Sequence, residues 1–478
     1  MTRVRGLLVA GTTSDAGKSI VTTGLCRAMV RRGLQVAPFK AQNMSNNSMV
    51  TRDGAEIGRA QWVQALAARA EPEAAMNPVL LKPGSDQRSH VVLMGQPAGE
   101  VSSRDFVDGR RHLAAAAYAA LDDLSSRYDV VVAEGAGSPT EINLRSSDYV
   151  NMGLAQHASL PTVVVGDIDR GGLFAAMYGT VALLDAADQR LVAGFVVNKF
   201  RGDVSLLRPG LDTLEELTGR SVFGVLPWHP DLWLDSEDAL DLEGRRSSEG
   251  RLRVAVVRLP RISNFTDVDA LGIEPSLDVV FASTPRQLAD ADLVVLPGTR
   301  ATIADLAWLR SRGLDEAVLA HAAAGKPVLG ICGGCQMLGR TIADPLGVEG
   351  PPTAVAGLGL IDADTEFTEE KVLRVHEPAG YEIHHGRVTG QLVSTGSTGS
   401  GRVAGTMVHG SLEDDAQRDA YLRQHLGVAS EASFPAARER RLDLLGDLVE
   451  QHLDVDRLVD LALEGVPDLP LLPPGATP

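Results

Sequence analysis

The chain has 478 residues, 44% of them hydrophobic, and a formal net charge of −17 at pH 7. A chain with this length and composition builds a large core, which excludes an intrinsically disordered protein and a small disulfide-stapled domain. The acidic balance and the 4% aromatic content also argue against a nucleic-acid partner, because such a surface needs basic and stacking groups.

The three cysteines, Cys26, Cys332 and Cys335, are too few to staple so long a chain and are typical of a reducing compartment. The apolar run after Arg3 and Arg5 is shorter than a signal peptide needs. No stretch reaches the ~18 apolar residues of a membrane span. We therefore expect a cytoplasmic protein with no membrane partner.

Short apolar runs alternate with helical stretches, which predicts an α/β fold with parallel sheets. A polar segment at 240–251 predicts a domain boundary. We expect two tandem α/β domains, at 1–245 and 252–445, followed by a C-terminal helix and a proline-rich tail at 446–478. The predicted strands lie at 6–10, 36–39, 130–133, 162–165 and 192–197 in the first domain, and at 252–257, 279–282, 293–296 and 328–331 in the second.

Residues 11–19 read GTTSDAGKS, between a predicted strand and a predicted helix. Glycines let successive N–H groups point at phosphate oxygens, while a lysine reaches the β- and γ-phosphates and a hydroxyl binds Mg²⁺. This pattern predicts an ATP site, and the alternative is a turn that only caps a helix. The expected ATP-binding residues of this loop are Gly11, Thr12, Thr13, Asp15, Ala16, Gly17, Lys18 and Ser19.

A phosphoryl-transfer site also needs carboxylates to hold Mg²⁺. Glu134 ends the predicted strand at 130–133 and is expected to bind the metal together with Ser19. Asp53 is a weaker metal candidate, with Glu56 as its competitor. Glu141, seven residues beyond Glu134, can reach the same cleft.

Asn198 and Lys199 end another predicted strand and are expected to bind the nucleotide base. The amide of an Asn can read a purine edge while the stem of the lysine covers the ring. An Asn–Lys pair is a weak signal by itself, and the neighbouring phosphate loop strengthens it.

Residues 328–336 read VLGICGGCQ, a strand that ends in a cysteine flanked by glycines. This is the elbow arrangement, in which a sharp turn exposes a nucleophile and nearby N–H groups face an oxyanion. The spacing G-x-C-x-G-x-Q selects Cys332, and a helix beginning after it favours the thiolate. Cys332 and Cys335 also form C-x-x-C, which leaves a redox or metal site as the alternative, although no second cysteine pair exists.

A cysteine nucleophile needs a base. His409, in GTMVHGSLE, is favoured because it resembles the end-of-strand histidine of class I glutamine amidotransferases. His384 and His385 are the rivals. Many of those enzymes carry a glutamate two residues after the histidine. Here that position is Ser411, so the third member of a triad is absent or is supplied elsewhere.

The longer phosphate loop, with five residues between Gly11 and Gly17, resembles that of the dethiobiotin synthetase-like ligases, which phosphorylate a carboxylate. Over nearly its whole length the chain resembles the cobyric acid synthase family. The blocks that carry this resemblance are GTTSDAGKS at 11–19, KAQNMSNNS at 40–48, DGAEIGRAQ at 53–61, NPVLLKP at 77–83, EGAGSPTEINL at 134–144, DIDRGG at 167–172, RLPRISNFTD at 258–267 and LPGTRATIADLAWLR at 296–310.

The resemblance implies an ATP- and glutamine-dependent amidation of four peripheral carboxylates (b, d, e and g) of adenosylcobyrinic acid a,c-diamide. It implies an acyl phosphate made with ATP, and ammonia released from glutamine through a thioester on Cys332 with His409 as the base. A polycarboxylate corrinoid needs many polar and charged partners. The candidates to bind it are Lys40, Gln42, Asn43, Lys82, Glu141 and Arg170.

Three other functions stay open at this point. The chain can amidate a different carboxylate, such as the a and c groups of the same macrocycle or a cell-wall precursor. It can be a P-loop switch ATPase, although such proteins usually carry an extra lysine early in the loop and 12–16 contains none. It can also be a glutamine sensor, against which intact Cys332 and His409 argue. The sequence leaves the oligomeric state open, a homo-oligomer included.

Overall fold

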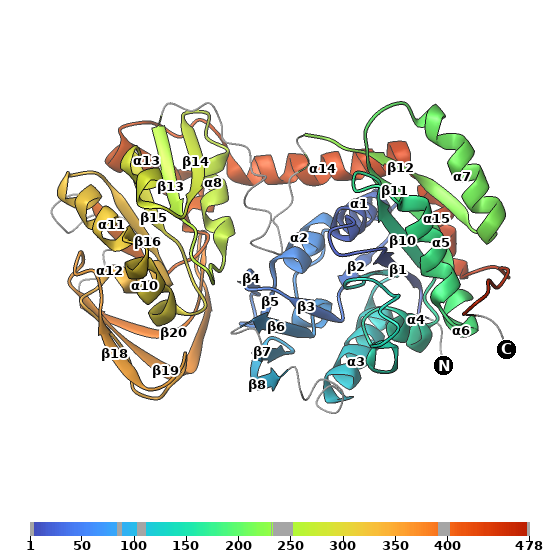
Figure 1. The fold of residues 1–478 in the computed structure, drawn as a ribbon, viewed down its shortest axis with the longest axis horizontal. Coiled ribbons are helices and arrows are strands. Elements are labelled where there is room, and N and C mark those ends of the chain that lie inside the picture. The colour runs from blue at the N-terminus through green and yellow to red at the C-terminus, as the bar shows by residue number, and fades with distance from the viewer. Residues whose placement is uncertain are drawn as a thin grey trace.

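A computed structural model of the protein describes residues 4–83, 88–102, 111–230, 232, 252–390 and 402–475. These residues form two α/β domains that lie side by side (Figure 1), as the alternation of strands and helices predicts. The predicted boundary at 240–251 lies outside the described residues. Within the described part of the chain, no helix is long and apolar enough to cross a membrane.

The first domain is built on a six-stranded parallel sheet in the order β12-β11-β10-β1-β9-β2. Strands buried on both faces are apolar at every position, and helices must cover both sides. Leu7 and Val9 therefore pack into one core while Leu8 packs into the other. All five strands predicted for this domain are confirmed. The six strands are β1 (Gly6–Gly11), β2 (Val36–Phe39), β9 (Val130–Glu134), β10 (Thr162–Asp167), β11 (Val192–Phe200) and β12 (Ser221–Pro227).

Helices cover the two faces of this sheet in separate groups. The first two helices pack on one face and the other four on the opposite face. Helix α1 begins directly after the phosphate loop, so the sheet and this helix together position the loop. The helices are α1 (Lys18–Arg31), α2 (Arg59–Ala67), α3 (Arg111–Arg127), α4 (Met152–Ala158), α5 (Leu173–Leu183) and α7 (Val204–Thr218).

The division predicted between residues 445 and 446 is wrong, because it falls inside the continuous helix α14 (Phe434–His452). Leu442 and Val449 of this helix, with Leu458 of α15 (Val455–Glu464), pack into the core beside α1. The chain thus leaves the second domain and returns to the first, and α14 spans both in Figure 1. Burial of this apolar stripe, rather than position in the sequence, decides where the helix belongs.

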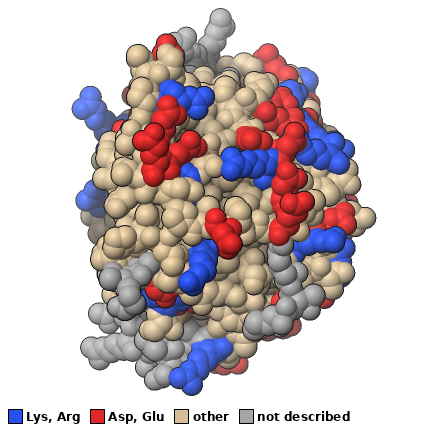
Figure 2. Space-filling model, turned by 90° about the vertical axis from the view of Figure 1, so that its right-hand side faces the viewer, with Lys and Arg blue, Asp and Glu red and all other residues tan. Residues whose placement is uncertain are grey.

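On the end of the first domain that faces away from the second, acidic and basic side chains are interspersed over the described surface (Figure 2). The basic groups drawn there do not gather into one continuous area.

A smaller sheet and a hairpin extend the first domain toward the second (Figure 1). The sheet has the order β3-β6-β7-β8, and the hairpin pairs β4 with β5. Met49 and Ile57 of the hairpin pack with Tyr381 and Ile383 of the second domain, which makes an apolar contact between the domains. The strands are β3 (Gln42–Met44), β4 (Ser48–Val50), β5 (Glu56–Gly58), β6 (Val79–Pro83), β7 (Arg88–Leu93) and β8 (Gln96–Ser102).

The second domain has a five-stranded parallel sheet in the order β14-β13-β15-β16-β21. The four strands predicted here are confirmed, and β21 (Val403–Thr406) completes the sheet. A separate four-stranded sheet in the order β18-β17-β19-β20 lies beside it. The remaining strands are β13 (Leu252–Val257), β14 (Leu277–Ala282), β15 (Leu293–Leu296), β16 (Val328–Ile331), β17 (Thr341–Asp344), β18 (Thr353–Ala356), β19 (Ala363–Val375) and β20 (Tyr381–Gly390).

Helices α10 (Thr302–Ser311), α11 (Leu314–Ala323), α12 (Gly333–Leu338) and α13 (Asp415–Leu426) pack around these strands. The shortest of them, α12, begins immediately after β16 and carries the cysteine elbow.

Buried ion pairs also join the two domains. Arg59 of α2 donates to Glu413 of the second domain at 2.7 Å, and Arg438 of α14 donates to the other oxygen of that carboxylate at 2.7 Å. The Ser48 backbone N–H donates to Asn264 Oδ1 at 2.9 Å. These contacts fix the hairpin against the second domain. They therefore also fix the predicted ATP site and the predicted cysteine site relative to each other.

Candidate active sites

The loop between β1 and α1 curls around the ammonium group of Lys18. Lys18 Nζ donates to the backbone oxygens of Thr13 at 3.0 Å and Gly137 at 3.1 Å. Gly17 has φ +99°, and a Cβ added there would lie 1.8 Å from Asn198 Nδ2. Only glycine fits this position, as expected where a backbone turns tightly around a phosphate.

Glu134 is buried at the end of β9, opposite the start of α1. Ser19 Oγ and Lys40 Nζ each donate to Glu134 Oε1 at 2.9 Å, and Gln64 Nε2 donates to Oε2 at 2.5 Å. Burial disfavours the ionised carboxylate, but the positive charges of Lys40 and Lys18 outweigh it and lower the pKa of Glu134. Glu134 is therefore an ionised carboxylate beside the hydroxyl of the phosphate loop.

Asn198 and Lys199 both lie against the phosphate loop. Asn198 Nδ2 donates to the backbone oxygen of Ala16 at 3.0 Å, and Lys199 Nζ donates to that of Asp15 at 2.9 Å. A small apolar recess beside Asn198 is walled by Leu226 and Pro227, and by Leu445, Leu448 and Val449 of α14. The C-terminal helix supplies one wall of this recess, which is too small in this arrangement to hold a nucleotide base.

Two predicted acids lie apart from Glu134. Asp53 is exposed in the turn between β4 and β5, where it accepts a hydrogen bond from Thr51. Glu141 is exposed in the loop after β9. The described contacts join neither acid to Ser19 or Glu134, so the structure does not bring Asp53 to the predicted metal ligands, or Glu141, a candidate to bind the corrinoid, to Glu134. Glu56, the competitor of Asp53, is buried between two lysines.

The corrinoid candidates are mostly engaged inside the fold. Gln42 accepts a hydrogen bond from Tyr149 Oη at 2.5 Å, and Asn43 donates to Gln61 at 3.0 Å. Lys40 is paired with Glu134, as described above. Arg170 is 63% exposed beside Asp15 and Asp167, so it alone of these cations projects into open space near the phosphate loop. Lys82 lies elsewhere, at the second reaction centre.

Cys332 occupies a strained turn between β16 and α12. Its φ of 49° and ψ of −108° are unusual for a residue with a side chain, and such a conformation costs about 1–3 kcal/mol. Its backbone N–H donates to the Thr406 oxygen at 2.7 Å. A Cβ added to Gly333 would lie 3.1 Å from the Thr299 backbone nitrogen. The turn is thus a nucleophile elbow, and the backbone at Thr299 lies close to it.

His409 lies beside Cys332, and buried Asp267 completes the group. His409 Nδ1 is 2.7 Å from Asp267 Oδ2, and the Gly410 backbone N–H donates to Asp267 Oδ1 at 2.8 Å. Burial disfavours a charged imidazole, but the negative charge of Asp267 and a hydrogen bond with Cys332 outweigh it and raise the pKa of His409 to about 10. The third member left open by Ser411 is therefore Asp267.

We expect Asp267→Asn to lower the rate of glutamine hydrolysis by about 10²- to 10⁴-fold, because the neutral amide neither orients nor stabilises the imidazolium. Loss of the carboxylate also lowers the pKa of His409, so the alkaline limb of the pH–rate profile should move to lower pH. Amidation with free ammonia should be unchanged. An unshifted alkaline limb would show that Asp267 does not control His409.

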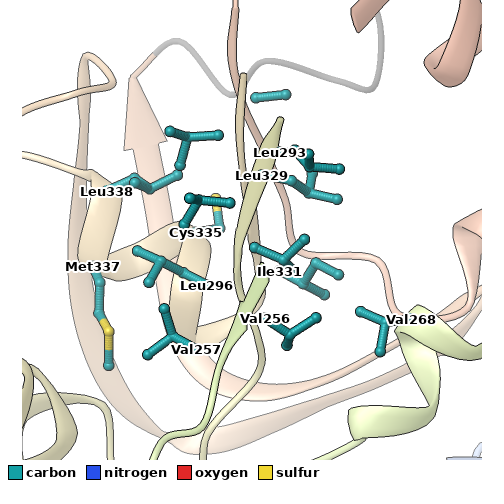
Figure 3. Packing of buried hydrophobic residues seen from close by; sticks show 14 of the residues in the cluster. Val256, Val257, Val268, Leu293, Leu296, Leu329, Ile331, Cys335, Met337 and Leu338 are labelled. Carbon is teal, nitrogen blue, oxygen red and sulfur yellow. The ribbon is translucent and has the colours of Figure 1, made fainter. Parts of the chain in front are cut away.

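Cys335 lies in the core, whereas the rival histidines, His384 and His385, line the same pocket as Cys332. Cys335 packs among Leu296, Ile331 and Leu338 in the core (Figure 3), and burial raises the pKa of its thiol to about 12. A protonated core thiol does not support a redox pair with Cys332. His385 Nδ1 donates to the Thr368 backbone oxygen at 3.2 Å, and burial lowers the pKa of His385 to about 4, while His384 Nε2 lies 3.3 Å from Glu382 Oε1.

A pocket opens next to Cys332 and reaches the boundary between the domains. Gln336 and Thr302 line it together, and the Thr302 hydroxyl donates to Gln336 at 3.1 Å. The charged side chains in its lining are Lys82, Arg300, Glu349 and Lys371, and Lys82 comes from the first domain. No motif in the sequence predicts that this lysine lies at the cysteine centre.

Comparison with known proteins agrees with this two-domain arrangement. Residues 7–241 match the model of the CobQ/CobB/MinD/ParA nucleotide binding domain, and residues 253–417 match the CobB/CobQ-like glutamine amidotransferase domain. The two matches define a glutamine amidotransferase joined to a nucleotide-binding domain.

Close relatives extend over both domains. The cobyric acid synthase of Mycolicibacterium gilvum is 72% identical, with 98% of this chain and 99% of the relative covered. Those of Mycobacterium ulcerans and Mycobacterium tuberculosis are 70% and 71% identical with the same coverage. The chain belongs to the cobyric acid synthase family.

Proposed function

We propose that this protein uses ATP and glutamine to amidate the b, d, e and g carboxylates of adenosylcobyrinic acid a,c-diamide, giving adenosylcobyric acid in cobalamin biosynthesis. The observation that carries this proposal is the 72% identity to a cobyric acid synthase over both domains. The protein is a glutamine-hydrolysing amide ligase. Its three-cysteine composition supports a cytoplasmic location.

The second domain is suited to release ammonia from glutamine. The Cys332 thiolate attacks the side-chain carboxamide carbon, and His409 gives a proton to the departing ammonia. Water then cleaves the thioester, which frees glutamate and restores the thiolate, with His409 taking up a proton. Asp267 holds the imidazole in place throughout. The Cys332 N–H donates to the Thr406 oxygen, so the other backbone N–H groups of the elbow are the candidates to stabilise the developing oxyanion.

The first domain is suited to activate the carboxylate. A substrate carboxylate oxygen attacks the γ-phosphorus of ATP, so ADP leaves and an acyl phosphate forms; ammonia then displaces phosphate. Lys18 lies where it can neutralise charge on the β- and γ-phosphates. Ser19 and Glu134, two oxygen ligands held 2.9 Å apart, fit Mg²⁺, which supplies charge neutralisation when bound. Arg170, which is exposed beside Asp15 and Asp167, is placed to meet a corrinoid carboxylate.

Mass spectrometry of the corrinoid tests this proposal. The protein is incubated with adenosylcobyrinic a,c-diamide, ATP, Mg²⁺ and glutamine, and each amidation exchanges a hydroxyl for an amino group. We expect four successive, equal mass changes. Consumption of ATP or glutamine without any change in corrinoid mass would overturn the corrinoid assignment and point to a different carboxylate. ATP hydrolysis without glutamine use would favour a switch ATPase.

A further inference from the structure

A buried charge cluster joins the two domains at the wall of the Cys332 pocket. Lys82 Nζ of β6 donates to Glu56 Oε1 at 2.6 Å and to Ser48 Oγ at 3.0 Å. Lys371 Nζ of β19, in the other domain, donates to Glu56 Oε2. Both lysines line the pocket together with Cys332.

The lining of the Cys332 pocket carries more positive than negative charge. Lys82, Arg300 and Lys371 line the pocket, and Glu349 is the carboxylate in the same lining. Outside the lining, Glu56 is paired with both lysines, and Glu100 acts on Arg300 as well. Buried charges are costly unless they are paired, so a pocket lined by three cations and one carboxylate is suited to a ligand that carries an anionic group. Each ammonium group has three N–H donors, and the contacts described above use two on Lys82 and one on Lys371.

The charge states are compatible with that role. Burial lowers the pKa of Lys371 to about 8, with Glu56 opposing the shift, so the side chain is mostly protonated at neutral pH. The pKa of Glu56 is well below its usual value because the two lysines outweigh its burial. Glu349 accepts hydrogen bonds from the Thr302 hydroxyl at 3.1 Å and the Ile303 N–H at 3.2 Å, and burial raises its pKa to about 7.

Free glutamine carries an α-carboxylate and an α-ammonium group in addition to the amide that Cys332 attacks. We propose that the glutamine site is shared between the domains: Lys82 of the first domain and Lys371 of the second bind the α-carboxylate, and Glu349 binds the α-ammonium group. This inference rests on the proposed glutaminase function. It also reassigns Lys82 from the corrinoid to glutamine.

A shared site has a consequence for how the two halves work together. Lys82 lies on β6, which pairs with β3, and β3 begins two residues after Lys40 at the Glu134 centre. The Asn77 side chain, just before β6, donates to the Lys40 backbone oxygen at 3.2 Å and accepts from the Gly58 N–H at 2.9 Å. The glutamine site is thus complete only while the first domain holds Lys82 against the Cys332 pocket of the second domain.

The test uses the full-length protein and compares glutamine with its α-carboxamide analogue, which keeps the reacting amide but has no α-carboxylate. Release of ammonia is measured for each, without reference to the corrinoid product. We expect the wild-type protein to prefer glutamine, and Lys82→Met and Lys371→Met each to raise the KM for glutamine about tenfold or more while the preference shrinks, as loss of one ion pair predicts. Lys326→Met is the matched control, because Lys326 bonds only to the Ala291 oxygen among its described contacts.

Amidation with free ammonia reports separately on the proposed function and should be unchanged in both variants. A wild-type protein that hydrolyses the analogue as well as glutamine would overturn the shared site even if neither variant folds. A raised KM for the corrinoid with an unchanged KM for glutamine would return Lys82 to the corrinoid site and also overturn the inference.

Discussion

Cys332→Ala is expected to lower glutamine-dependent amidation by at least about 10³-fold, because removal of a covalent nucleophile leaves only the surrounding binding groups to act. Amidation with free ammonia should proceed at the wild-type rate. The described contacts of Cys332 are with residues of the second domain, His409 among them. The ATP centre around Glu134 belongs to the first domain, so the substitution should leave it intact. Rates with each nitrogen source, followed by corrinoid mass, measure both effects.

The neighbouring cysteine offers the matched control. Cys335→Ala removes the same thiol group from helix α12, which begins directly after Cys332, but from a side chain that points into the core (Figure 3). We expect this variant to keep glutamine-dependent activity. If Cys335→Ala instead abolished glutamine use as fully as Cys332→Ala, the two cysteines would act as a pair and the elbow would not explain the chemistry.

Lys18→Met is expected to abolish amidation from both nitrogen sources, by at least about 10²-fold, because the methionine keeps the buried stem but removes the charge meant for the β- and γ-phosphates. Lys18 Nζ is already held at the centre of the loop by two backbone oxygens. Little reorganisation is therefore needed when ATP binds.

The control for this variant is the reactivity of Cys332. Alkylation of the cysteine should occur at the wild-type rate in Lys18→Met, which shows that the second domain is intact. Ammonia-dependent amidation that persisted near the wild-type rate would remove Lys18 from phosphoryl transfer. Together the two substitutions should separate glutamine hydrolysis from carboxylate activation. Cys332→Ala should lose only the use of glutamine, and Lys18→Met should lose amidation from both nitrogen sources.

The sequence alone determined the features that lie within one short stretch of chain. The phosphate loop at 11–19 and the elbow around Cys332 each consist of consecutive residues between a strand and a helix, so their geometry follows from local backbone conformation. The buried strands could be predicted for the same reason, since each is a short apolar run between turns.

Only the tertiary structure decided which distant groups meet. Asp267 lies 142 residues before His409, and Lys82 belongs to a different domain from Cys332. A single buried carboxylate or lysine has no periodic pattern, and its partner is set by how the sheets pack. Helix α14 shows the same limit, because its apolar stripe is visible in the sequence but the core that it joins is not. Neighbouring residues determine the conformation of a loop or a turn, whereas a site built from both domains depends on long-range packing.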